Sequence, residues 1–134
     1  MANSKEVYER DIMAVKTKIL EKILNDLSGI EGIEENAIVS RDGLLMASTT
    51  IEGPSAETFA AMSASMLGAA ETAIAELGKG IPKRVIIESK QCKLVVTGAG
   101  PKGLLIVMAK PTTGLGLILL ELDNAVEKLK KILQ

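Results

Sequence analysis

The segment from Ala56 to Leu77 most limits how this chain can fold, because it is small or apolar around its whole circumference when drawn as a helix. One helical stripe is formed by Phe59, Met62, Met66, Ala70, Ala73 and Leu77. Other faces also carry small or apolar residues, and the charged side chains are Glu57, Glu71 and Glu76. A helix of this kind is usually covered on more than one side. We expect one side to pack on the chain's own sheet and another to meet a second element or a second subunit.

Two more helices are expected, one near each end of the chain. Residues 7–27 have apolar side chains at intervals of three and four, and Ser28-Gly29 forms a reasonable stop. The stripe consists of Ile12, Val15, Ile19, Ile23 and Leu27. The last helix should follow Pro111, with Thr112 or Thr113 as its cap, whereas Ser55 should cap the central helix. The first half of the last helix also reads as a strand, and we interpret the whole as one helix.

Five short runs predict strands. Residues 37–40 and 44–48 flank Arg41-Asp42-Gly43, and Asp-Gly between two apolar runs is a good hairpin signal. Residues 84–88, 93–97 and 104–108 are rich in β-branched side chains and are separated by turn-length gaps. Such short connections exclude parallel crossovers. The prediction is one α+β (α/β) domain over residues 1–134, in the order α-β-β-α-β-β-β-α, with helices on the faces of an antiparallel sheet.

Composition removes several functional classes. The 134 residues contain no histidine and one cysteine, which excludes Ser-His-Asp and Cys-His catalysis and His- or Cys-cluster metal sites. The net charge of -1 and two aromatic residues, Tyr8 and Phe59, give no footprint for nucleic acid or an anionic membrane. The N-terminus is charged where a signal peptide is apolar, and a lone Cys92 suits a reducing compartment. We expect a cytoplasmic protein without cofactor or metal.

Some motifs imitate functional sites. The run GAGPKG at residues 98–103 satisfies G-x-G-x-x-G, but a strand follows where a dinucleotide site needs a helix, so we interpret it as a hairpin turn. Gly78-Lys79-Gly80 is interpreted as a helix stop, and Asp42 as a turn residue that bonds its own backbone. Cys92 is expected in a turn as a free thiol. Glu121 and Asp123 are assigned to a solvated helix face.

Met62 and Met66 have two readings of equal weight. Methionine is an ordinary filler of aliphatic cores. It also repacks easily against varied surfaces, which suits a partner interface. The sequence does not decide between these roles.

Four segments in combination resemble the Roadblock/LC7 family. They are Gly32 to Leu44 as its first hairpin, Phe59 to Ser65 as the opening of its alanine-rich helix, Val85 to Glu88 as its middle strand, and Gly114 to Gly116 before its last helix. The similarity runs from about Ile12 to Leu133. This family includes dynein light chains and prokaryotic regulators of Ras-like GTPases, and the chain is most similar to the regulator branch.

The resemblance implies a profilin-like, five-stranded antiparallel sheet with one helix on one face and two on the other. It also implies a homodimer in which the central helices pack together and the middle strands pair across a two-fold axis. The interface residues implied in this way are Met62, Ser65, Met66, Ala69, Ala73, Arg84, Val85, Ile86, Ile87 and Glu88. In regulatory relatives the paired helices contact the GTPase, and the central helix here contains no arginine to serve as a finger.

The leading hypothesis is therefore a non-enzymatic homodimeric regulator or scaffold of a small Ras-like GTPase. One alternative is a structural adaptor within a larger assembly, as in the dynein-associated relatives. Another is a sensor of a small ligand, because similar folds bind metabolites. An enzyme is the least expected reading, since the chain has no histidine and no convergent polar cluster.

Overall fold

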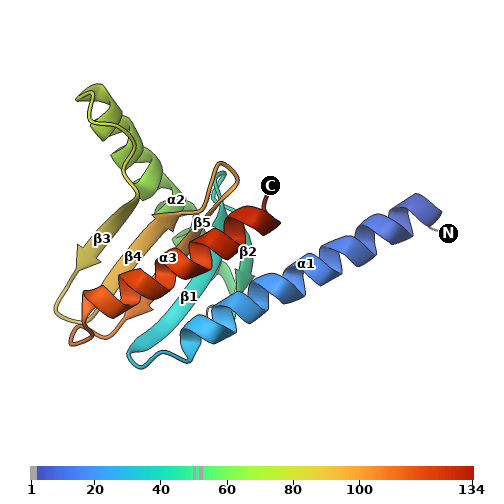
Figure 1. Ribbon diagram of the computed structural model, residues 1–134, viewed down its shortest axis with the longest axis horizontal. Helices are drawn as coiled ribbons and strands as arrows, with labels where there is room; N and C mark the ends of the chain where they lie inside the picture. The colour runs from blue at the N-terminus through green and yellow to red at the C-terminus, as the bar shows by residue number, and fades with distance from the viewer. Residues whose placement is uncertain (1–2, 50, 52) are drawn as a thin grey trace.

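The computed structural model describes residues 3–49, 51 and 53–134. Three helices and five strands follow the predicted order (Figure 1). They are α1 (Ser4–Ser28), β1 (Ile33–Ser40), β2 (Leu45–Ser48), α2 (Gly53–Glu76), β3 (Arg84–Glu88), β4 (Lys93–Gly98), β5 (Gly103–Ala109) and α3 (Leu115–Ile132). Strand β1 begins four residues earlier than expected, at Ile33, and the final segment is one helix, as interpreted from its sequence.

The strands form one antiparallel sheet in the order β2-β1-β5-β4-β3. Strand β5 lies in the centre, which explains its unbroken apolar run, because both of its faces are covered. Its odd-numbered residues, including Leu105 and Val107, pack in the cluster with α1 and α3. Its even-numbered residues, including Leu104 and Ile106, pack in the cluster beneath α2. The expected arrangement of one helix on one face and two on the other is thus confirmed (Figure 1).

Helix α1 is longer than the sheet that it covers. Its first turn is fixed by a capping box, in which the Asn3 side chain accepts a hydrogen bond from the Glu6 backbone N–H at 2.8 Å. The predicted apolar stripe is buried only toward the end of the helix, where the first buried residue is Leu20. Ile12 and Val15 lie in the part that projects beyond the sheet, so they are exposed (Figure 1).

Helix α2 turns a narrow strip of small side chains to the sheet. Its buried residues are Ala56, Ala60, Ser63 and Leu67, so the predicted stripe beginning at Phe59 is not the sheet-facing one. The helix begins at Gly53, which places Ser55 inside its first turn and contradicts the predicted cap. Its end confirms the predicted stop: Gly78 has φ +64° and Lys79 N–H bonds to the Ile74 carbonyl, which is a Schellman arrangement.

The predicted caps of α3 are wrong. Gly114 is its N-cap, without a side-chain hydrogen bond. Thr113 instead packs on Gly32, where a Cβ would lie 2.2 Å from the threonine Oγ1. Gly32 also has φ +96°, so this close contact between the chain before β1 and the chain before α3 depends on glycine.

The turns agree with the interpretation of these motifs as turns without a catalytic or ligand-binding role. Residues 98–103 connect β4 to β5 and are followed by a strand, so no helix meets the glycines. Asp42 lies in the β1–β2 turn, but the side chain that bonds this turn is Ser40, whose Oγ accepts from the Leu44 N–H at 3.0 Å. Gly43 has φ +88° and approaches the backbone of α2. Cys92 is a free thiol in the β3–β4 turn.

Candidate self-association and partner-binding surface

The outer face of α2 is a smooth surface of small side chains. Ser65, Ala69 and Ala73 are exposed on the side opposite the buried strip. The Ser65 hydroxyl donates to the Ala61 carbonyl at 3.0 Å, so this polar group is satisfied within the helix. Small side chains in a row allow another helix to approach closely.

The two methionines of α2 have different positions. Met62 is 55% exposed and lies on the outer face. Met66 is half-buried and packs against the cluster between α2 and the sheet. The interface reading therefore fits the position of Met62, whereas Met66 lies at the border of the core. Ala64 also packs against this cluster.

Strand β3 is an edge of the sheet, apolar on the face of Val85 and Ile87, with Ile86 between the charged Arg84 and Glu88 on the other face. Val85 and Ile87 pack toward the cluster beneath α2. Ile86 points to the opposite face and is 40% exposed. Glu88, at the end of the strand, is exposed. An apolar edge strand of this length is a ready template for pairing with another strand.

The backbone of β3 shows which peptide groups face the open edge. The Lys83 carbonyl accepts from the Gly98 N–H at 3.1 Å, and the Ser89 N–H donates to the Cys92 carbonyl at 2.9 Å. Residues in an antiparallel strand alternate in the direction of their peptide groups, so the odd-numbered residues face β4. Arg84, Ile86 and Glu88 consequently present their N–H and C=O groups to the open edge.

Arg84 joins β3 to α3 through Asp123. Its Nη2 lies 2.6 Å from one Asp123 oxygen, and the Lys83 Nζ lies 3.1 Å from the other. Burial raises the pKa of Asp123, but the hydrogen bonds and charges of Lys83 and Arg84 outweigh it and hold the pKa below its ordinary value. Asp123 is therefore an ion-pair partner, which corrects its assignment to a solvated face. Within the described residues, the buried Nη1 of Arg84 has no hydrogen-bond partner.

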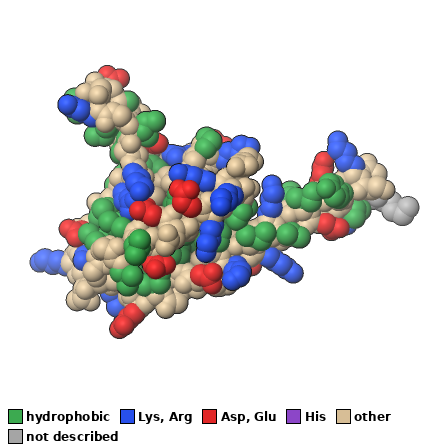
Figure 2. All heavy atoms as spheres, viewed as in Figure 1, with side chains coloured by type: hydrophobic (Ala, Val, Ile, Leu, Met, Phe, Trp, Pro, Cys, Tyr) green, Lys and Arg blue, Asp and Glu red, His purple; other side chains and the backbone are tan. Residues whose placement is uncertain are grey.

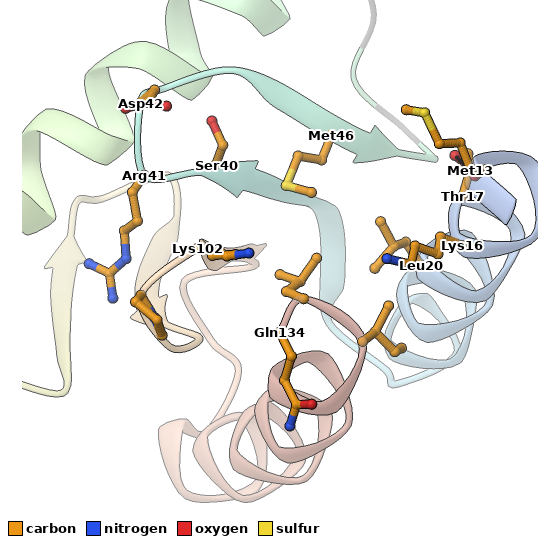
Figure 3. Close-up of a pocket in the computed structure, with 13 residues that line it drawn as sticks. Met13, Lys16, Thr17, Leu20, Ser40, Arg41, Asp42, Met46, Lys102 and Gln134 are labelled. Atoms are coloured by element: carbon orange, nitrogen blue, oxygen red, sulfur yellow. Dashed lines mark hydrogen bonds between the residues drawn. The ribbon is translucent and has the colours of Figure 1, made fainter. Parts of the chain in front are cut away.

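Arg41 ties α2 to the end of the sheet, a role that the sequence did not reveal. Its Nε and Nη2 donate to the Gly100 carbonyl at 3.1 and 2.9 Å, and its Nη1 lies 2.9 Å from Glu71 on α2. Both side chains are 29% exposed. Figure 3 shows the guanidinium turned away from Met46 and toward the neighbouring turn.

A groove of about 630 Å³ opens between the projecting part of α1 and the turns at this end of the sheet. Its lining includes the apolar side chains of Leu20, Met46 and Leu133. Lys16 and Lys102 extend into it from opposite walls (Figure 3). Asp42 also lines the groove, so it combines apolar side chains with charges of both signs.

Two projecting segments carry exposed apolar side chains (Figure 2). One is the N-terminal half of α1, where Tyr8 is 67% exposed. The other is the end of α2 and the residues after it, where Leu77 and Ile81 are 69% and 82% exposed. Within residues 3–49, 51 and 53–134, no helix has the length and apolarity to cross a membrane. The same residues include no group of three or more acidic or cysteine side chains placed to hold a metal ion.

Comparison with known proteins gives consistent matches. Residues 19–109 match the Roadblock/LC7 domain family. An uncharacterized protein of Methanocaldococcus jannaschii is 35% identical over 112 residues, which cover 84% of this chain and 97% of the relative.

Solved structures with the same fold are more distant in sequence. A Roadblock/LC7 domain from Streptomyces avermitilis has a TM-score of 0.79 at 21% identity, covering 84% of this chain and 95% of that one. The gliding protein MglB from Thermus thermophilus has a TM-score of 0.79 at 21% identity, covering 88% and 90%. Profilin from Schizosaccharomyces pombe has a TM-score of 0.55 at 16% identity, covering 86% and 93%. The fold is therefore of the profilin-like Roadblock type.

Proposed function

The chain belongs to the Roadblock/LC7 family, and from this premise we propose that it is a cytoplasmic, non-enzymatic homodimer that regulates or scaffolds a small Ras-like GTPase. Members of this family are generally regulators or adaptors and not enzymes. The observation that supports the dimer most is that two contacting elements each leave a surface uncovered, namely the outer face of α2 and the open edge of β3. Together they contain most of the residues that the resemblance assigned to an interface.

The open edge of β3 has a self-complementary register. If two copies pair antiparallel about Ile86, Arg84 of one strand stands opposite Glu88 of the other. These three residues are the ones whose peptide groups face outward, so each can take part in the ladder between the copies. The proposed strand pairing would therefore join two five-stranded sheets into one.

The side chains support the same register. In it, the exposed Glu88 carboxylate of one copy approaches the strand position of Arg84 of the other. Opposite charges directly across two strands stabilise their pairing. The Ile86 side chains would meet at the two-fold axis and remove apolar surface from water.

The proposed GTPase surface is the platform that two α2 helices form when they pair. The outer face of each helix offers Met62 beside small residues, and a methionine adapts to different partner surfaces. No arginine lies on α2, so the proposal is that the dimer repositions catalytic groups of the GTPase. A structural adaptor is the remaining alternative, and it predicts binding that is independent of nucleotide.

A nucleotide-dependent pull-down tests the function. Immobilised wild-type protein would be incubated with extract from its own source, loaded with either GDP or a non-hydrolysable GTP analogue. We expect a small GTPase to be retained in one nucleotide state in preference to the other. The variant Met62→Glu should lose it, whereas Leu117→Glu on the distant helix α3 should retain it. Recovery of no GTPase in either state would refute the proposal, and equal recovery in both would favour the adaptor.

A further inference from the structure

The part of α1 from Ser4 to Ile19 is called the α1 extension. It projects away from the sheet into solvent, and Leu20 is the first buried residue after it (Figure 1). Its sixteen residues correspond to roughly 24 Å of helix. Almost all of it precedes the part of the chain that matches the family, which begins at residue 19. The extension is also far from the β3 edge.

One side of the α1 extension carries four large apolar side chains. They are Tyr8, Ile12, Val15 and Ile19, and they are 67%, 37%, 57% and 41% exposed. Their spacing of four, three and four residues is that of the a and d positions of a coiled coil. A shallow groove lined by Tyr8, Ile12 and Val15 follows the same side. Lys5 and Lys22 occupy the next positions and end the apolar seam.

The α1 extension is expected to have low stability while it is exposed to solvent. Isolated helices of about fifteen residues are marginally stable in water, and the capping box at Asn3 supports only the first turn. A contiguous row of large apolar side chains on a projecting helix marks an interaction surface. A second helix laid along this seam would stabilise the extension and cover the row.

The charged residues beside the seam indicate which helix can pack on it, because they complement those of a second α1 extension. Glu9 and Asp11 flank its N-terminal half, and Lys16 and Lys18 flank its C-terminal half. When two such helices run antiparallel, Tyr8 of one packs with Ile19 of the other, and Ile12 packs with Val15. Glu9 then faces Lys16 of the second copy, and Asp11 faces its Lys18. Such charges at the edges of a seam set partner choice and orientation.

We propose that the α1 extension pairs antiparallel with the α1 extension of a second copy of this chain. The arrangement provides four complementary charge pairs, because the two-fold axis repeats each contact, and it opposes Lys5 and Lys22 twice at the ends of the seam. A parallel pair would also oppose two pairs of these lysines, but it would provide only the contact of Asp11 with Lys16 and its repeat. Antiparallel pairing also places the two sheets at opposite ends of the helix pair.

The surface at the base of the extension fits the same partner. A groove of about 330 Å³ between α1 and α3 continues the seam beyond Ile19. Lys128 and Lys131 lie along it. The first turn of the second helix would end at this groove, and its Glu6 would bring a negative charge to these two lysines.

This pairing uses a surface separate from α2 and β3, so it joins two of the proposed dimers. Both contacts are isologous, and a chain with two isologous contacts forms assemblies with an even number of subunits. The species expected at high concentration has four times the chain mass of 14.2 kDa or a larger even multiple.

Charge exchange tests the pairing. One variant carries Glu9→Lys with Asp11→Lys, and the other carries Lys16→Glu with Lys18→Glu. Sedimentation velocity over a concentration series should show that each variant alone stays at twice the chain mass, whereas an equal mixture regains the larger species. The variant Ile12→Glu should remove the larger species, and Met13→Glu, on the next face of the helix, should keep it. Wild type that stays at twice the chain mass over the whole series, with Ile12→Glu leaving that mass unchanged, would overturn the proposal.

Disulfide trapping tests the orientation in a Cys92→Ser background. Tyr8→Cys and Ile19→Cys, mixed under oxidising conditions, should form a cross-linked pair, whereas either one alone should not. A cross-link in Tyr8→Cys alone would show parallel helices and overturn the antiparallel arrangement.

Failure of this pairing is distinguishable from failure of the α2 and β3 dimer. If only the proposed dimer fails, Ala69→Arg leaves the mass of the wild type unchanged and Ile12→Glu produces monomers. If only the α1 pairing fails, Ile12→Glu has no effect and Ala69→Arg produces monomers.

Discussion

The two faces of the sheet are covered in different ways. One face is packed by α1 and α3, which contribute large buried side chains such as Leu24, Leu122 and Leu129. The other face is covered by α2 alone, which contributes mainly Ala60 and Leu67 to its cluster. The first face buries more apolar volume, and the second brings a helix close to the strands by means of small side chains.

This difference explains why α2 is the better candidate for an interface. A helix with small residues on its inner strip and small residues on its outer face can be packed closely from both sides. Helix α3 buries large residues on its inner side, exposes Leu117 and Leu120 on the other, and carries lysines near its C-terminus. The stability of the monomer should therefore depend more on the α1 and α3 face, and its association more on α2.

The largest effect is expected from Leu122→Ala on the α1 and α3 face. Leu122 is fully buried, and removing its side chain leaves a cavity that should lower the free energy of unfolding by about 3 kcal/mol. Urea denaturation followed by circular dichroism would measure it. Leu117→Ala on the same helix, at a side chain that is 55% exposed, should cost less than about 0.5 kcal/mol. Equal costs at the two positions would show that this face is not the main source of stability.

The second effect concerns association. Ala69→Arg on the outer face of α2 should raise the dissociation constant of the proposed dimer by about 100-fold, because a charge would be buried there without a partner. Light scattering on diluted samples would measure it, with Ala75→Arg, off the outer face of the same helix, as the control. Ala64→Arg is less informative, because Ala64 packs against the cluster beneath α2 and its change would also disturb the fold. An unchanged dimer in Ala69→Arg would remove α2 from the interface.

Local signals were sufficient for most of the fold. The unbroken apolar run of β5, the Asp-Gly turn before β2 and the glycines after α2 each depend on neighbouring residues only, and all three were predicted correctly. The order of the elements then followed from short connections that permit only antiparallel pairing. The strand order was not predicted, because hairpin signals alone do not place β1 beside β5.

The features that were not predicted depend on which residues the fold brings together and on how far each element extends. The α1 stripe was read correctly as helical, but its first half is exposed because the helix extends beyond the sheet. Arg41 bonds Glu71 and Gly100, which are 30 and 59 residues away, and Asp123 bonds Arg84, which is 39 residues away. The expected threonine cap failed because Thr113 is held against Gly32. These pairings arise only after the sheet has formed.

The third prediction compares the ion pair between Arg41 and Glu71, which joins α2 to the sheet, with a more exposed ion pair. A double-mutant cycle with Arg41→Ala and Glu71→Ala should give a coupling of about 1 kcal/mol, because both side chains are 29% exposed and the arginine is held in place by a carbonyl. The same cycle on Lys22 and Asp26, whose side chains are 76% and 60% exposed, should give about 0.3 kcal/mol. Equal couplings would show that Arg41 does not fix α2 to the sheet.

The smallest effect is expected at Asp123, which ties β3 to α3. Because its folded pKa lies below the ordinary value of 3.8, the ionised form stabilises the fold above about pH 5, and that stabilisation is lost as the pH falls through the folded pKa. Its side chain is 38% exposed, so solvent screening limits the contribution to less than about 1 kcal/mol. Asp123→Asn should therefore be less stable than wild type at neutral pH, and the difference should shrink toward zero as the pH falls to 2. A difference that persists at pH 2 would mean that the packing of the side chain, and not its charge, holds β3 to α3.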